Sequence, residues 1–339
     1  MNIFIVYPSG KLGDLIWHLP FLKIISKHYN KRIIFITRSS TDAKHLLKNE
    51  NHIKEVIYVD FKKGFFNYWL DVFYLVKKFN IKKAKDVWIL DKVSRPAIAG
   101  FLSRANNVFA YGTWPQNIFI NNKNRLIKND LKTHYIARGK KFLKLMNFKK
   151  QYEEPHIKMI EEDFLIIKQK LNLSAKPIIA YGVDSREKHR MWPINKFIEL
   201  IKKISQKHKL QHCIIASPSN QNIVIEILKN IKNIEAHDCS QLTITEMAPL
   251  LKKAIIFIGN DSGPYNLSAA VGTMSIGING ALKPLTHSKY FFPITPKEKV
   301  TYSLNDRPVD KYGKEIKERW IQERITVEQV YGVFSDIIN

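Results

Sequence analysis

The chain has 339 residues, more than one domain usually holds, so we expect two domains of roughly 150 residues each. Hydrophobic residues make up 45% of the sequence and aromatic residues 12%, which indicates a folded globular protein and excludes long disorder. The formal net charge of +25 suits nucleic acid, an anionic membrane or a phosphorylated substrate, although a Lys-rich composition that only solvates the surface would give the same charge.

The sequence disfavours several functional classes. No stretch resembles a zinc finger, a short-linked helix-turn-helix or an RRM aromatic signature, so we expect no nucleic-acid partner. Cys213 and Cys239 are too far apart for a CxxC motif, and a disulfide framework would need more cysteines. The first residues run into a strand without the pattern of a signal peptide, and the apolar runs are much shorter than the roughly 20 residues that span a bilayer. We therefore expect a soluble cytoplasmic protein.

Short β-branched or aromatic runs alternate with longer helical runs, which is typical of parallel βα units. Before residue 147 we expect strands at 2–7, 32–37, 55–59, 86–90 and 107–110, and helices at 14–28, 41–48, 66–79, 95–103 and 131–146. After the polar stretch 147–156 we expect strands at 176–181, 211–216, 234–237, 254–259 and 274–278, and helices at 161–171, 194–207, 220–230, 245–251, 264–271 and 326–337. Because the polar stretch interrupts the alternation, we predict two α/β domains, residues 1–150 and 151–339, with Thr326 as the N-cap of the last helix.

The turn between the first strand and the first helix contains Gly10, Lys11, Gly13 and Asp14. In open α/β sheets ligands bind at the carboxyl ends of the strands, so we expect this turn to face a ligand cleft, where glycines allow close approach. The spacing is not G-x-G-x-x-G, which disfavours a dinucleotide site. Asp14 is either only the N-cap of the helix or a carboxylate that accepts a proton from a sugar hydroxyl.

A second polar turn, residues 259–264, ends a buried strand and begins a helix with the sequence Gly-Asn-Asp-Ser-Gly-Pro. Pro264 suits the first helical turn, and the free amides of Ser262 and Gly263 would form a positive pocket for a diphosphate. The alternative is a helix that is simply well capped.

A basic loop, residues 184–193, follows the first strand of the second half and reads Asp-Ser-Arg-Glu-Lys-His-Arg-Met-Trp-Pro. A Lys or Arg in it would neutralise charge on a leaving diphosphate. The alternative is a charged loop that is only solvated.

The Asp14 turn, the basic loop ending in Trp192-Pro193 and the helix start at 260–264, in this order, resemble the ADP-heptose:lipopolysaccharide heptosyltransferase family, glycosyltransferase family nine. The resemblance runs from Phe4 to the last helix, where residues 325–330 look like the family's closing element. It implies a GT-B fold, in which two Rossmann-like domains face each other across a cleft. Residues 1–150 would then bind the acceptor, and residues 151–339 the nucleotide sugar.

The same resemblance implies the reaction and the partners. Such an enzyme moves heptose from ADP-heptose to the anionic inner core of lipopolysaccharide by direct displacement with inversion, and it is peripheral at the cytoplasmic face of the inner membrane. It implies no metal and no cofactor, and the sequence contains no Asp-x-Asp pair that would hold a metal diphosphate. The resemblance implies Asp14 as catalytic base, Arg190, Ser262 and Gly263 at the donor diphosphate, and Asp261 at the donor sugar. Ser185, a small hydroxyl residue in the loop of Arg190, and Asn266 are further implied donor-binding residues.

The chain departs from the family pattern at two positions. Asn266 stands where the family commonly has His, and an amide cannot titrate as an imidazole does. The stretch 219–221 lacks the acidic residue that the family often uses for the ribose. Both departures concern the donor, so two alternatives stay open: transfer of a different nucleotide-linked sugar to another glycan or a protein, and a non-catalytic anion-binding protein.

Overall fold

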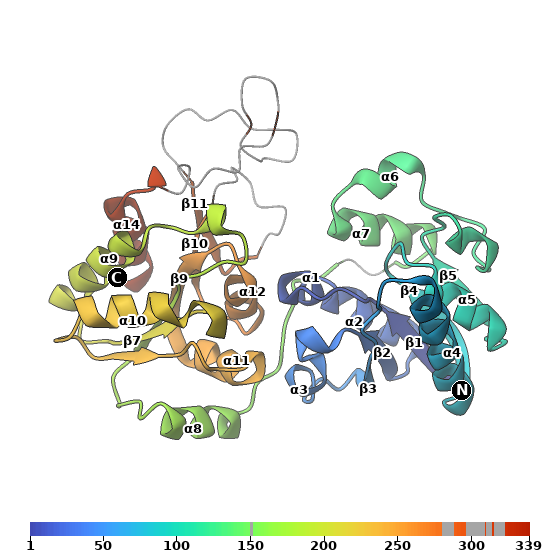
Figure 1. The fold of residues 1–339 in the computed structure, drawn as a ribbon, viewed down its shortest axis with the longest axis horizontal. Coiled ribbons are helices and arrows are strands. Elements are labelled where there is room, and N and C mark those ends of the chain that lie inside the picture. Colours follow the sequence, from blue (N-terminus) through green and yellow to red (C-terminus); the bar gives the residue numbers. More distant parts are fainter. Residues whose placement is uncertain (150–151, 280–287, 296–308, 310–313, 315–322) are drawn as a thin grey trace. The chain divides into compact units, whose positions relative to one another are not determined.

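The computed structural model describes residues 1–149, 152–279, 288–295, 309, 314 and 323–339 (Figure 1). It divides the chain into two compact units, unit 1 (Met1–Ile157) and unit 2 (Lys158–Asn339), each built on one parallel sheet. The boundary expected at residues 150 and 151 lies outside the described residues. None of the helices in the described ranges combines the length and the apolar character that a membrane span needs.

Unit 1 has a five-stranded sheet in the order β3-β2-β1-β4-β5. Its strands are β1 (Asn2–Val6), β2 (Ile33–Thr37), β3 (Ile53–Tyr58), β4 (Ala84–Ile89) and β5 (Asn107–Ala110). Strand β2 is buried along its whole length and β1 from Ile3 onward, because helices cover both faces of a parallel sheet. The order reverses between β1 and β4, and such a switch point is where open α/β sheets bind ligands.

Helices pack on both faces of this sheet. They are α1 (Leu12–Ile16), α2 (Leu19–Tyr29), α3 (Ala43–Leu46), α4 (Phe65–Ile81), α5 (Arg95–Leu102), α6 (Lys128–Lys132) and α7 (Tyr135–Leu145), with short 3-10 turns η1 (Ser39–Thr41) and η2 (Gln116–Ile118). Side chains of α4 and α5 join one core face, together with Phe4 and Val87. On the opposite face Trp88 contacts Tyr29 of α2 and Phe142 of α7.

Unit 2 has a six-stranded sheet in the order β11-β10-β9-β6-β7-β8, with a switch point between β6 and β9. Its strands are β6 (Ile178–Gly182), β7 (Gln211–Ile215), β8 (Ala236–Asp238), β9 (Ala254–Asn260), β10 (Ser275–Ile278) and β11 (Phe291–Ile294). All its neighbouring strands are parallel. Counted within the unit, this is the order 3-2-1-4-5-6 of Rossmann folds, and unit 1 has the first five strands of the same order.

The helices of unit 2 are α8 (Glu161–Lys170), α9 (Ile194–Lys207), α10 (Gln221–Asn230), α11 (Ile244–Lys253), α12 (Gly263–Ala270) and α14 (Val327–Ile338), with 3-10 turns η3 (Lys188–Arg190) and η4 (Pro218–Asn220). Helices α9, α10 and α14 bury Phe197, Val224 and Phe334 against one face of the sheet. Thr326 is the N-cap of α14, as predicted, and its Oγ1 accepts a hydrogen bond from the Gln329 amide at 3.2 Å.

Three elements differ from the sequence prediction. The helix expected at 14–28 is two helices, α1 and α2, because Pro20 has no amide hydrogen and its ring would clash with the carbonyl four residues earlier. The helix expected at 131–146 is also divided, and His134 caps the second part, α7, by accepting a hydrogen bond from the Ile136 amide. Strand β11 was not expected, because Pro293 breaks the strand pattern of its sequence. The strand forms nevertheless, because it lies at the edge of the sheet, where a proline is tolerated.

Candidate functional site

Two glycines face each other across the strands at the switch point of unit 2. Strands β6 and β9 pair with Gly182 opposite Gly259, and a Cβ atom on Gly259 would lie only 2.6 Å from the Gly182 carbonyl oxygen. A larger residue at position 259 would therefore push the strands apart. The basic loop (residues 184–193) and the turn at 261–262 begin beside each other at this edge.

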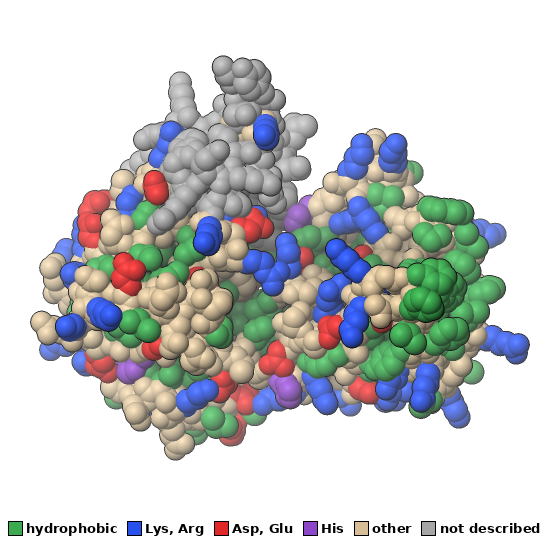
Figure 2. Space-filling view, viewed as in Figure 1, with side chains coloured by type: hydrophobic (Ala, Val, Ile, Leu, Met, Phe, Trp, Pro, Cys, Tyr) green, Lys and Arg blue, Asp and Glu red, His purple; other side chains and the backbone are tan. Residues whose placement is uncertain are grey.

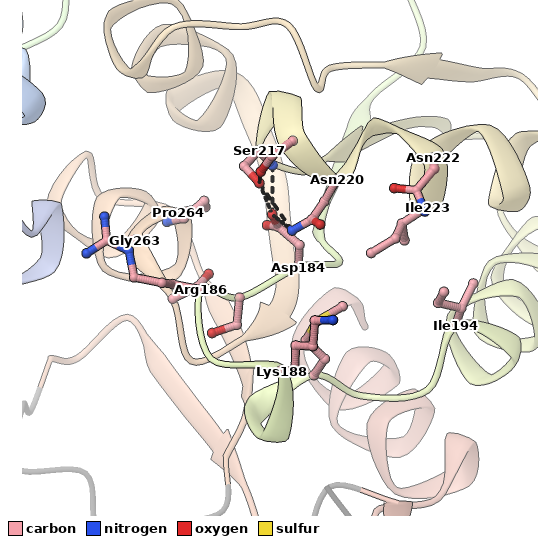
Figure 3. Close-up of a pocket in the computed structure, with 14 residues that line it drawn as sticks. Asp184, Arg186, Lys188, Ile194, Ser217, Asn220, Asn222, Ile223, Gly263 and Pro264 are labelled. Carbon is pink, nitrogen blue, oxygen red and sulfur yellow. Dashed lines mark hydrogen bonds between the residues drawn. The ribbon is translucent and has the colours of Figure 1, made fainter.

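A pocket of about 730 Å³ opens at this edge (Figure 3). Four segments line it: the basic loop, the start of α9 at Ile194, the segment from Ser217 into α10, and the start of α12. Arg186 and Lys188 supply positive charge, and Ile194 and Ile223 supply an apolar wall. The pocket can therefore accommodate a ligand with an anionic part and an apolar part.

The first turn of α12 lines this pocket. Ser262 is the N-cap in an extended conformation and forms no side-chain cap hydrogen bond, and Pro264 occupies the first turn. The Ser262 hydroxyl is buried, and it has no hydrogen-bond partner within the part of the chain that the structure describes. The first amides of a helix have no partner inside the helix and lie at the positive end of its dipole. An anion is the natural ligand of such an end.

Asp184 fixes the shape of the pocket wall. Its side chain is buried, and Oδ2 accepts hydrogen bonds from the Ser217 amide at 2.8 Å, the Ser217 hydroxyl at 2.6 Å and the Asn220 side chain at 3.1 Å (Figure 3). These bonds join the loop after β6 to the loop after β7. The sequence patterns alone suggested no role for Asp184. The available signal was an Asp two residues after the end of one strand and a Ser-Pro-Ser-Asn stretch after the next strand.

The expected donor residues fall into two groups. Ser185, Ser262 and Gly263 line the pocket. Arg190 and Asp261 are not among its described lining residues. They form an ion pair of 3.3 Å, and Arg190 Nε also lies 3.0 Å from Glu187 Oε2.

Asn266 lies one turn into α12 and is likewise outside the described pocket lining. Its side-chain amide donates a hydrogen bond of 2.7 Å to the Ser262 carbonyl. Asn266 therefore stabilises the first turn of the helix whose amides face the pocket.

Trp192 anchors the end of the basic loop. Its backbone amide donates to Asn260 Oδ1 at 2.8 Å, and its indole Nε1 donates to the Ile325 carbonyl at 2.9 Å. Trp192 and Asn260 are both fully buried. The loop is thus held at its far end by strand β9 and by the segment before α14.

The switch point of unit 1 carries the Asp14 turn. Strand β1 pairs with β4, with Val6 opposite Ile89, and the Leu90 amide donates to the Val6 carbonyl at 3.0 Å. Asp14 lies inside the first turn of α1, whose N-cap is Lys11. The interpretation of Asp14 as the N-cap is therefore wrong, because the helix begins at Leu12, two residues before Asp14.

The Asp14 carboxylate is partly buried and hydrogen-bonded. Ser9 donates to its Oδ2 at 3.2 Å. Burial raises the pKa of Asp14, whereas the Ser9 hydrogen bond, the charge of Lys11 and a hydrogen bond from Tyr135 lower it. The net direction is upward, which makes this carboxylate a stronger base than an exposed one.

The two glycines of this turn act through the backbone. A Cβ atom on Gly10 would lie 3.1 Å from the Ser40 hydroxyl, which itself donates to the Gly10 carbonyl at 3.2 Å. The Gly13 carbonyl accepts the Trp17 amide at 3.1 Å, which closes α1. The turn therefore packs closely on the loop after β2.

A stack of aromatic side chains lies beside Asp14. His18 is fully buried, its Nδ1 lies 2.8 Å from the Asp14 carbonyl, and its ring stacks on Tyr7 and Tyr135 with centroids 3.4 Å and 5.2 Å away. Burial lowers the pKa of His18 to about 3, so the ring is neutral at physiological pH. Burial also raises the pKa of Tyr7, and the charges of Asp14 and Asp91 add to that increase.

Asp91 is a second carboxylate at this switch point, and the sequence analysis missed it. It follows β4, the strand beside β1, and burial raises its pKa against the opposing effects of the Lys92 amide and the Arg138 charge. The signal was an Asp close to the end of a predicted strand, but its meaning depends on which strand lies next to β1.

Solved structures identify the class of fold. The chain is similar to E. coli ADP-heptose lipopolysaccharide heptosyltransferase II, with a TM-score of 0.77 and 15% identity over 100% of this chain and 98% of that one. It is also similar to a glycosyl transferase family 9 protein from Veillonella parvula, with a TM-score of 0.76 and 16% identity over 99% and 97% of the two chains. E. coli heptosyltransferase WaaC with ADP-2-deoxy-2-fluoro heptose gives a TM-score of 0.67 at 14% identity over 99% of both chains. These likenesses confirm the predicted α/β, GT-B-like fold with two parallel sheets.

The family follows from the sequence. The sequence model of glycosyltransferase family 9 (heptosyltransferase) matches residues 99–319, more than half of the chain, and the chain therefore belongs to this family. It is a heptosyltransferase-like glycosyltransferase, as the sequence analysis predicted. No curated protein sequence matches the chain.

Proposed function

We propose that the chain transfers heptose from ADP-heptose to the anionic inner core of lipopolysaccharide, with inversion and without a metal, as a cytoplasmic protein peripheral at the inner membrane. Membership of family 9 supports sugar transfer. The observation that carries the donor assignment is the pocket, where Arg186, Lys188 and the free end of α12 surround one space. The related WaaC structure contains an ADP-heptose analogue, which agrees with this donor class.

In this proposal unit 2 binds the donor. The diphosphate accepts hydrogen bonds from the first amides of α12 and is neutralised by Arg186 and Lys188. The apolar wall at Ile194 and Ile223 contacts the nucleoside. Arg190 contacts the diphosphate and Asp261 the donor sugar, and both contacts compete with the ion pair that these two side chains form with each other.

Unit 1 supplies the base. Asp14 accepts the proton of the acceptor hydroxyl while the hydroxyl oxygen forms a bond to C1 of the heptose. The bond between C1 and the diphosphate oxygen breaks on the opposite side, and its electron pair leaves with ADP. The positive end of α12 and the nearby cations stabilise the charge that develops on the leaving group. Neutral His18 and Tyr135 position Asp14 through the contacts described above.

The test is a transfer assay with purified enzyme, ADP-heptose and a lipopolysaccharide acceptor that lacks heptose, following released ADP and the anomeric configuration of the product. We expect inverted product, undiminished turnover in EDTA, and tighter binding of ADP than of UDP or GDP. Tight ADP binding without transfer to this acceptor would leave the donor assignment in place and refute the acceptor. Equal binding of all three nucleotides would refute the donor.

A second candidate is transfer of a different nucleotide-linked sugar to another glycan or a protein. The observation that favours it is Asn266, which replaces a titratable His and is bonded to the Ser262 carbonyl. A screen of nucleotide sugars that measures the released nucleotide separates the two candidates.

A further inference from the structure

Helix α4 carries an apolar surface on the side that faces away from its sheet. Phe66, Leu70 and Phe73 are 83%, 64% and 60% exposed and recur at three- and four-residue spacing, so they lie on one face of the helix. Phe65, Trp69 and Tyr74 are also exposed beside them. We call these six residues the α4 aromatic face. The opposite side of the helix, with Val72, Leu75 and Phe79, is fully buried in the core.

The apolar surface continues beyond α4. Helix α5 packs against α4 and exposes Phe101 and Leu102, and Trp114 and Ile118 are exposed in the next segment. Figure 2 shows the hydrophobic side chains gathered over α4 and α5, with lysine and arginine side chains around their edges. Among the described residues of unit 2 the exposed large apolar side chains occur singly or in pairs on separate elements. A contiguous aromatic surface of this kind marks an interaction site.

Lysines flank the α4 aromatic face at both ends. Lys62 and Lys63 precede the helix, and Lys77, Lys78, Lys82, Lys83 and Lys85 lie in its last turns and just after it. Asp71 is the only acidic residue between positions 62 and 85, and it pairs with Arg95 at 3.5 Å. Aromatic rings between flexible cations suit the boundary of an anionic bilayer, where rings enter between headgroups and lysines reach the phosphates.

We propose that the α4 aromatic face docks this protein on the surface of an anionic lipid bilayer. A second copy of the chain is a poorer occupant, because symmetric pairing of two α4 helices would bring two sets of lysines together without acidic partners. The inference rests on the proposed function in one respect: the acceptor of the proposed reaction is embedded in the membrane, so the enzyme has to bind there. The docking itself involves no sugar, donor or catalytic residue.

The experiment measures binding of the full-length protein to vesicles of phosphatidylcholine with and without phosphatidylglycerol. We expect binding only to the anionic vesicles, and weaker binding as salt rises.

The double variant Phe66→Ser/Phe73→Ser should bind at least about tenfold more weakly, because the free energy gained by moving two aromatic rings from water into the bilayer surface is lost. The double variant Lys62→Gln/Lys63→Gln should lose part of the salt dependence. The matched control is Ile166→Ser on α8, which removes an apolar side chain that is 63% exposed and should leave binding unchanged.

Two further measurements make every outcome decisive. The circular dichroism spectrum should be the same in the Phe66/Phe73 variant and the wild type, which shows that the variant is folded whether or not the protein transfers heptose. Light scattering gives the oligomeric state. Unchanged vesicle binding by that variant overturns the proposal, and a wild-type oligomer that becomes monomeric in the variant would identify a self-contact instead. Vesicle binding through α4 together with no heptose transfer would retain the docking surface and refute the proposed function.

Discussion

The turns after β1 and β6 occupy the same place in two sheets of the same strand order, but they carry different chemistry. The turn after β1 places Asp14 among Tyr7, His18 and Tyr135, where burial raises the pKa of the carboxylate. The turn after β6 places Arg186 and Lys188 in one pocket with the start of α12. One switch point is suited to accept a proton, and the other to bind an anion.

The difference shows that strand order fixes where a ligand binds, whereas the residues of the turn decide which ligand it is. Separate roles for the two turns predict separate consequences of mutation. A change in unit 1 should alter turnover and its pH dependence, and a change in unit 2 should alter donor affinity.

The largest effect is expected for Asp14→Asn. The amide keeps the size of the side chain but cannot accept the proton, so kcat should fall by about 10²- to 10⁴-fold while the Kd for ADP stays the same. Steady-state kinetics and calorimetric titration with ADP measure the two quantities. Asp60→Asn, an exposed carboxylate that accepts a hydrogen bond from the Ser39 amide, is the control and should turn over normally. A weakened ADP affinity in Asp14→Asn would contradict the division of roles.

The next effect concerns Arg186→Ala and Lys188→Ala. Each removes a cation from the pocket, and a charge-assisted hydrogen bond contributes roughly 1.5–3 kcal/mol, so the Kd for ADP should rise about tenfold to a hundredfold. The pH dependence of kcat should not move. Lys202→Ala, on the exposed side of α9, removes the same charge from unit 2 and should bind ADP normally. Wild-type ADP affinity in both pocket variants would show that the diphosphate lies elsewhere.

Each unit buries a neutral histidine, which predicts loss of stability in acid. Burial lowers the pKa of His18 to about 3 and that of His212 to about 4, from a usual value of 6.5. Below pH 6.5 the unfolded chain takes up protons that the folded chain does not, so stability decreases as the pH falls until the folded pKa is reached. Each group contributes up to about 1.4 kcal/mol per pH unit in this window.

Urea unfolding from pH 7 to pH 4 tests this linkage. His18→Phe should reduce the acid dependence without removing it, because His212 still titrates. The same acid slope in the variant and the wild type would contradict the assignment to His18.

The smallest effect is expected for Ser9→Ala. The Ser9 hydrogen bond lowers the pKa of Asp14, so its loss should raise that pKa further and move the acidic limb of the kcat profile upward by roughly half a pH unit to one unit. Ser40→Ala, whose hydroxyl bonds to the Gly10 carbonyl, is the matched control. A downward shift of the limb would mean that Asp14 is not the titrating base.

The strands of both sheets, except β11, could be predicted because buried parallel strands are uninterrupted apolar runs in the sequence. Two of the three failures of the sequence prediction lie at prolines: Pro20 divides the first helix, and Pro293 interrupts the pattern of the edge strand β11. The motifs predicted Ser185, Ser262 and Gly263, which the structure places on the pocket wall.

The roles of Asp91 and Asp184 depend on which strands and loops are neighbours. Asp91 lies at the switch point because β4 pairs with β1, and Asp184 joins two loops through its bonds to Ser217 and Asn220. A single sequence does not reveal which strands and loops are neighbours.

The Trp192 anchor also determines when the donor site can form during synthesis. Its indole donates to the carbonyl of Ile325, so the basic loop can be fixed only after the ribosome has made residue 325. The residues of unit 1 emerge earlier, and unit 1 can fold first, because domains generally fold as units in the order of synthesis. A nascent chain that stalls between the two units would present the Asp14 turn and the α4 aromatic face without a donor site.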